Sequence, residues 1–127
     1  MQDERGHRGL KVWQEGMRLA EEIYRVTADF PRDEIYGLVA QLRRAAVSIP
    51  SNIAEGYGRG GRDYARFVSM GYGSLLELET QLELARRLRF LSDDDAQQLR
   101  ECMSELGRML NGLRNGLKRR RSDDPAP

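Results

Sequence analysis

The sequence predicts an all-α protein, an antiparallel up-down-up-down four-helix bundle with a proline-kinked second helix. Apolar residues recur at steps of three and four in four segments, which is the spacing of one face of an α-helix. Of the 127 residues, 39% are hydrophobic and 32% are charged, a balance typical of helices that each expose one face to water. Short connections between such helices favour antiparallel neighbours.

The first two helices are expected on either side of a proline. Apolar residues repeat at helical spacing from Trp13 to Phe30, and Pro31 should end that helix. A second stripe extends from Ile35 to Ile53.

The second helix contains its own interruption. Asp33 is the expected N-cap, and Pro50 lies inside the stripe. Because proline lacks a backbone N–H and crowds the preceding turn, we expect the helix to kink or restart there. Four glycines within residues 56–61 then predict a helix stop and a loop.

The third and fourth helices have clear boundaries in the sequence. The third is expected to begin near Arg62 and to continue to Leu88. Ser92 and Asp95 have the spacing of a capping box, which predicts the start of the fourth helix, and its apolar stripe ends at Leu117. Glycines on these helices are expected to mark close helix contacts: Gly71, Gly73, Gly107, Gly112 and Gly116.

The chain has the length of one domain. We expect a flexible N-terminus at 1–9, the bundle at 10–118 and a disordered basic tail at 119–127. The single cysteine, Cys102, is interpreted as a packed inert thiol, and a reducing cytoplasm is the expected location. No run approaches the roughly 20 consecutive apolar residues that a membrane span needs, so no membrane contact is expected.

Apolar residues exceed what one small bundle has to bury. Residues 45–54 are nearly apolar on all sides, and Trp13 and Tyr24 add to this surface on the first helix. The excess predicts a subunit interface. A broad contact inside a single bundle is the alternative.

Several stretches resemble one known family. They are LKVWQEGMRLAEEIY, YGLVAQLRRAAVSIPSNIAEGYGR, GSLLELETQLELARRL and ELGRMLNGL. They are similar to the small four-helix-bundle proteins encoded by intervening sequences in bacterial large-subunit ribosomal RNA genes. The resemblance implies a left-handed bundle that assembles into a ring, a homopentamer, without established catalytic activity. It also implies a distant likeness of architecture to accessory proteins of diversity-generating retroelements, which contact a reverse transcriptase and nucleic acid.

The inventory of side chains gives no catalytic site, metal site or cofactor. His7 is the only histidine, which excludes Ser-His-Asp, Glu-x-x-His and His-Cys zinc arrangements. Glu79 and Glu83 form an acidic pair beside an apolar stripe, followed by Arg86 and Arg87. We interpret this group as a salt-bridged face rather than a magnesium site.

Polar residues beside the apolar stripe of the second helix predict a buried network. Buried charge must be paired, so we expect Arg43 or Arg44 to meet a carboxylate of the third helix. This structural polar network comprises Arg43, Arg44, Asn52, Glu55, Glu77 and Glu79.

The position of the charges gives the sharpest functional hypothesis, although the net charge is only +1. In an antiparallel bundle, the starts of the first and third helices and the ends of the second and fourth lie at one end. Eleven of the 21 basic residues fall there. A basic surface attracts phosphate backbones, and we predict nucleic-acid contacts at Arg59, Arg62, Arg66, Lys118, Arg119, Arg120 and Arg121. The alternative is that these arginines only end helices and solubilise a tail.

The sequence thus predicts a non-catalytic homo-oligomeric bundle, a pentamer, that binds RNA or another nucleic acid through its basic end. The alternative is a structural or adaptor protein that binds itself or another protein, such as a reverse transcriptase, without affinity for nucleic acid. The excess apolar surface favours the second hypothesis, and the clustered charge favours the first.

Overall fold

The computed structural model describes the backbone of residues 6–123 and the side chains of residues 6–120. Four α-helices make up most of this part of the chain: α1 Lys11–Thr27, α2 Leu38–Arg59, α3 Gly61–Arg87 and α4 Asp93–Asp123. Two short 3₁₀ helices precede α1 and α2, η1 at Gly6–Gly9 and η2 at Arg32–Glu34.

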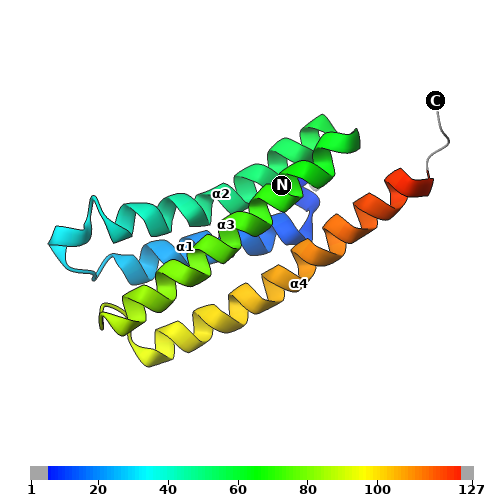
Figure 1. The fold of residues 1–127 in the computed structure, drawn as a ribbon. Coiled ribbons are helices and arrows are strands. Elements are labelled where there is room, and N and C mark those ends of the chain that lie inside the picture. Colours follow the sequence, from blue (N-terminus) through cyan, green and yellow to red (C-terminus); the bar gives the residue numbers. More distant parts are fainter. Residues whose placement is uncertain (1–5, 124–127) are drawn as a thin grey trace.

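The helices form a closed bundle in which consecutive helices run in opposite directions (Figure 1). α2 lies between α1 and α3, α4 packs against α3 and α1, and the contact between α2 and α3 is the most extensive. Between residues 6 and 123 every regular element is helical. The all-α four-helix bundle predicted from periodicity is therefore confirmed.

All four helices supply the hydrophobic core. Each fully buried aliphatic side chain contributes about 1.5–3 kcal/mol relative to an exposed one. The largest of these are Leu19 and Ile23 of α1, Leu42, Ile49 and Ile53 of α2, Val68, Leu75 and Leu78 of α3, and Leu106 and Leu110 of α4.

The core face of α1 includes Ala20, Ile23 and Thr27 of the predicted stripe but not all of its members. Val12 and Val26 are buried with the core side chains of α1, whereas Met17 and Tyr24 are exposed and Trp13 is half-buried. α1 carries two adjacent apolar faces, and only the face with Val12, Ile23 and Val26 turns toward the core. The second remains on the surface beside α2.

The start of α2 differs from the prediction. The Glu34 carboxylate, and not Asp33, caps it by accepting a hydrogen bond from the Leu38 N–H (3.1 Å to Oε2). α2 continues through Pro50 to Arg59 without restarting. The kink at Pro50 stays a prediction. A Cβ added at Gly16 would lie 3.5 Å from the Pro50 ring, so α1 and α2 approach closely at this proline.

The predicted loop at 56–61 is wrong, because residues 56–59 remain helical and Gly60 alone separates α2 from α3. Gly60 and Gly61 have φ angles of +67° and +55°, a region that glycine enters without strain. At Gly56, an added Cβ would lie 2.7 Å from the Phe67 Cβ, so this glycine lets α3 pack directly against the last turns of α2.

Both predicted termini are more ordered than expected. Residues 6–9 form η1, which packs against α1 and α2, and residues 119–123 continue α4. The helix extends this far because Leu113 and Leu117 still pack against the core. Residues 1–5 and 124–127 lie outside the described part of the chain.

The helix glycines give a first testable prediction. Gly56→Ala should lower the free energy of unfolding by about 1–3 kcal/mol, because the new Cβ meets backbone and Cβ atoms that cannot rotate away. Gly58→Ala, on the same turn with nothing within 4 Å, should raise it by up to about 1 kcal/mol. Urea unfolding measures both variants, and shifts of the same sign would contradict the packing described.

Candidate nucleic-acid interface

The predicted basic residues gather at one end of the bundle. Arg59 lies at the end of α2, Arg62 and Arg66 lie in the first two turns of α3, and residues 118–120 lie in the last turns of α4. The α2–α3 corner and the end of α4 reach the same end of the molecule (Figure 1). We call the described members of this group the basic pole: Arg59, Arg62, Arg66, Lys118, Arg119 and Arg120. The side chain of Arg121 lies outside the described residues.

Aromatic rings lie among these charges, a feature that the charge pattern did not predict. Tyr57 and Tyr64 meet edge to face with ring centroids 5.7 Å apart. The Phe67 ring lies beneath two guanidinium groups, with Arg59 at 5.2 Å and Arg66 at 4.9 Å from its centroid. These contacts fix both arginines over the start of α3.

The end of α4 lies close enough to this aromatic group to act on it electrostatically. Burial raises the pKa of the Tyr64 hydroxyl, the neighbouring Tyr57 adds to the rise, and the positive charge of Arg120 opposes it. The ends of three helices therefore bring positive charge to the same end of the bundle.

Carboxylates neutralise only part of the basic pole. Arg59 pairs with Glu55 (3.0 Å) and Asp63 (3.8 Å), and Arg66 pairs with Asp63 (3.4 Å). These pairs are half-exposed, so each contributes little and is screened by salt. Among the side chains described, no carboxylate pairs with Arg62, Arg119 or Arg120, and all three are exposed.

The prediction that an ion pair joins Arg43 or Arg44 of α2 to a carboxylate of α3 is wrong. Arg43 turns toward α1, where its Nε donates to the Thr27 Oγ1 (2.9 Å) and its guanidinium lies 4.4 Å from the centroid of the Tyr24 ring. Arg44 is exposed, and no ion pair joins it to Glu77 or Glu79 in the described part of the chain. The aromatic face left on the surface of α1 provides the competing partner for Arg43.

Neutral groups make the polar contact between α2 and α3 instead. The hydroxyls of Ser48 in α2 and Ser74 in α3 lie 2.9 Å apart, and within α2 the Asn52 amide donates to the Ser48 carbonyl (2.8 Å) and hydroxyl (3.0 Å). Glu77 accepts a hydrogen bond from Gln81 on its own helix (3.1 Å). Of the predicted network, Asn52 lies at the interhelical contact, while Glu55 belongs to the basic pole.

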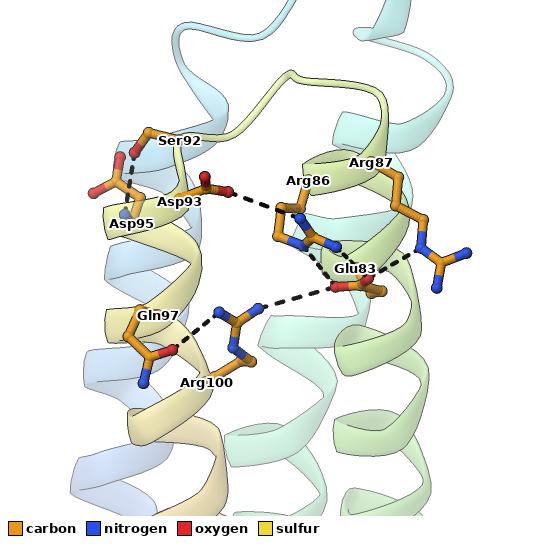
Figure 2. A network of polar contacts seen from close by, with 8 residues as sticks. All are labelled: Glu83, Arg86, Arg87, Ser92, Asp93, Asp95, Gln97 and Arg100. Atoms are coloured by element: carbon orange, nitrogen blue, oxygen red, sulfur yellow. Dashed lines mark hydrogen bonds and ion pairs between the residues drawn. The ribbon is translucent and has the colours of Figure 1, made fainter.

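A charged network lies at the opposite end, around the α3–α4 connection (Figure 2). Glu83 accepts hydrogen bonds from Arg86 (2.8 Å) and Arg87 (3.0 Å), and Arg100 of α4 reaches it at 4.0 Å. Hydrogen bonds from Arg86 and then Arg87 lower the pKa of Glu83 to about 2. The predicted salt-bridged face is therefore present at Glu83, whereas Glu79 lies beside it without an ion pair among the residues described.

An apolar groove runs between α1 and α2 on the outside of the bundle. Its volume is about 560 Å³, and only Glu21 and Ser51 add polar side chains to its lining. The floor and walls are Trp13, Met17, Ala20, Tyr24, Val47, Pro50 and Ala54. This groove is the second apolar face of α1 packed beside the apolar second half of α2.

The remaining candidate groups are structural. Among the side chains of residues 6–120, no three of His, Cys, Asp or Glu lie where they could share a metal ion. Within residues 6–123, no helix is long and apolar enough to cross a membrane. Burial, with negative charge from Glu15, raises the pKa of the half-buried Cys102 thiol. His7 packs edge to face on Trp13 at 5.2 Å rather than extending freely into solvent.

A family model described as the 23S rRNA-intervening sequence protein matches residues 8–112. The chain belongs to this family. The resemblance noted in the sequence is thereby confirmed, and the match includes Arg59, Arg62 and Arg66 but ends before Lys118. The description of the 23S rRNA-intervening sequence protein family names no enzymatic activity.

One solved structure shares the fold of this family member. It is a protein of unknown function from the S23 ribosomal protein family of Bacteroides thetaiotaomicron, with a TM-score of 0.73 and 20% sequence identity. The similarity covers 81% of this chain and 97% of that chain. No curated protein matches the sequence.

The charged network of this family member gives a second prediction. The folded pKa of Glu83 lies below the ordinary value of 4.5, so its contribution to stability is present above about pH 4.5 and is lost as the pH falls toward about 2. Glu83→Gln should therefore flatten the loss of stability across this interval, measured by urea unfolding at stepped pH. In an NMR titration, replacing Arg86 and Arg87 by glutamine should move the Glu83 midpoint upward, and an unchanged midpoint would contradict the assigned cause.

Proposed function

We propose that this protein is a non-catalytic homo-oligomer that binds the phosphate backbone of RNA through its basic pole. The observation that supports the proposal is that the end of α2, the start of α3 and the end of α4 lie at one end of the bundle, where Arg59 and Arg66 lie over the Phe67 ring. Positive charge concentrated at one end of a chain with a net charge of +1 attracts polyanions to that end.

The side chains of the pole suit phosphate contacts without base recognition. Arginine offers planar pairs of N–H donors that match phosphate oxygens. Arg62, Arg119 and Arg120 lack carboxylate partners among the described side chains, so phosphates need not displace an existing ion pair to reach them. Arg59 and Arg66 are held in place by Asp63 and Phe67 and would border the bound strand.

The apolar groove supports self-association. The groove exposes a contiguous apolar surface that a small monomeric bundle rarely leaves in water, made by Trp13, Met17, Tyr24 and Val47. Burial of such surface is the main favourable term in protein association. We propose that the groove is the contact between subunits, five of them as the resemblance implies. Assembly would repeat the basic pole and strengthen RNA binding by multivalency.

The same groove favours a second candidate function. If another protein occupies it, the chain is an adaptor, and a reverse transcriptase is one partner that the architectural likeness suggests. Under this alternative the basic pole only solubilises the helix ends.

The RNA proposal predicts a salt-dependent interaction that charge reversal removes. Changing Arg62, Arg119 and Arg120 together to glutamate should weaken binding to a structured RNA more than tenfold at about 50 mM salt. The slope of log affinity against log salt should fall by about 2, because three phosphate contacts are lost. Fluorescence anisotropy at several salt concentrations measures both quantities.

A matched variant controls for net charge. Arg32, Arg44 and Arg89 are also exposed arginines but lie away from the pole, and their change to glutamate alters the net charge equally. This control should lose much less affinity. Equal losses from both triple variants would show that only overall charge matters, and no binding by the wild type would remove the proposal.

The groove predicts the effect of single substitutions on subunit assembly. Met17→Glu or Val47→Glu should reduce the mass measured by light scattering to that of smaller species, because a buried unpaired carboxylate opposes the contact. Leu76→Glu removes a similarly exposed apolar side chain from α3 and should leave the mass unchanged. If only Leu76→Glu dissociated the oligomer, the subunit contact would lie on α3 and not at the groove.

A further inference from the structure

Charge attraction does not account for the aromatic side chain at the tip of the α2–α3 corner. Tyr57 lies in the last turn of α2 with 40% of its surface exposed. Its edge-to-face contact with Tyr64 holds the ring in place, with the centroids 5.7 Å apart and an interplanar angle of 87°. A phosphate-binding surface needs no such ring.

The surface around Tyr57 is unusually bare. Gly58, Gly60 and Gly61 surround it in the sequence, and a Cβ added at any of the three would meet nothing within 4 Å. Between residues 57 and 62 the charged side chains are those of Arg59 and Arg62, and Arg59 pairs with Glu55 and Asp63. Because the three glycines add no side chains, a flat group can approach the exposed part of the Tyr57 ring at this corner.

We propose that Tyr57 stacks against an unpaired base of the strand whose phosphates the basic pole holds, so that single-stranded nucleic acid is the ligand of this site. The inference rests on the proposed function. Arginines bind the phosphates of paired and unpaired strands alike, but a base inside a duplex has both faces covered by its neighbours. Away from the ends of a duplex, a tyrosine ring can stack only on a base that is unpaired or turned out, and such stacking tolerates any sequence.

The test compares two ligands and two tyrosines. A labelled unstructured RNA of about 12 nucleotides and a blunt duplex of the same length are titrated at fixed low salt. The wild type should prefer the single strand, and Tyr57→Leu should weaken that binding about tenfold while leaving duplex binding and the salt dependence unchanged. Tyr57→Phe keeps the ring and should bind normally. Tyr36 lies in the connection between α1 and α2, at the opposite end of the bundle from the basic pole, and is 96% exposed. Tyr36→Leu should therefore have no effect.

A measurement on the wild type makes the test independent of any loss of folding. A strand that contains 2-aminopurine should lose fluorescence when it binds, since stacking quenches this base. Absence of quenching, or an equal loss of affinity for strand and duplex in Tyr57→Leu, would overturn the stacking role. If Tyr57→Leu binds normally while the Arg62, Arg119 and Arg120 variant does not, the proposed function stands and this inference fails. If neither ligand binds the wild type, both fail.

Discussion

The close contact between α2 and α3 positions the part of the basic pole that these two helices carry. Gly56 lets Phe67 and Tyr64 approach the backbone of α2, and Gly71 lies against Ile49 and Asn52 farther along the same contact. Because the last turn of α2 touches the first turns of α3, a single residue is enough to connect the two helices. Tyr57 then meets Tyr64, and Asp63 pairs with Arg59. A bulkier residue at position 56 would spread the helices at the point where the charges gather.

A second close approach explains why the apolar groove exists. Gly16 brings α1 against Pro50, and the two helices leave a furrow along their outer side. α1 turns one apolar face to the core and a second to this furrow, so its apolar residues cover too wide an arc for a helix in an isolated bundle. Arg43 covers part of the second face through Tyr24 and His7 packs on Trp13, while the other side chains of that face line the open groove.

Helical periodicity was sufficient to predict the fold because four long apolar stripes leave few alternatives. The capping box predicted at the start of α4 is also present, since the Ser92 hydroxyl accepts a hydrogen bond from the Asp95 N–H (3.1 Å). The basic pole followed from antiparallel order alone. Finer features depended on distances that a sequence does not contain. Gly73, Gly112 and Gly116 face open space, while Gly56, which the sequence pattern assigned to a loop, makes the tightest approach. Arg43 contacts the Tyr24 ring and the Thr27 hydroxyl of α1 instead of a carboxylate of α3. The exposed ring of Tyr57 could have been suspected from its place beside the glycines and arginines of the α2–α3 corner.

The helical state of residues 118–120 changes what binding at this end would cost. Ordering a flexible segment loses about 1–2 kcal/mol of backbone entropy per residue, and that loss subtracts from affinity. In α4 this entropy has already been lost on folding, since Leu113 and Leu117 anchor the helix to the core. The backbone that carries Arg119 and Arg120 therefore has a set direction relative to α3. A preorganised end of this kind selects ligands by the spacing of their negative groups, whereas a disordered tail would adapt to any of them.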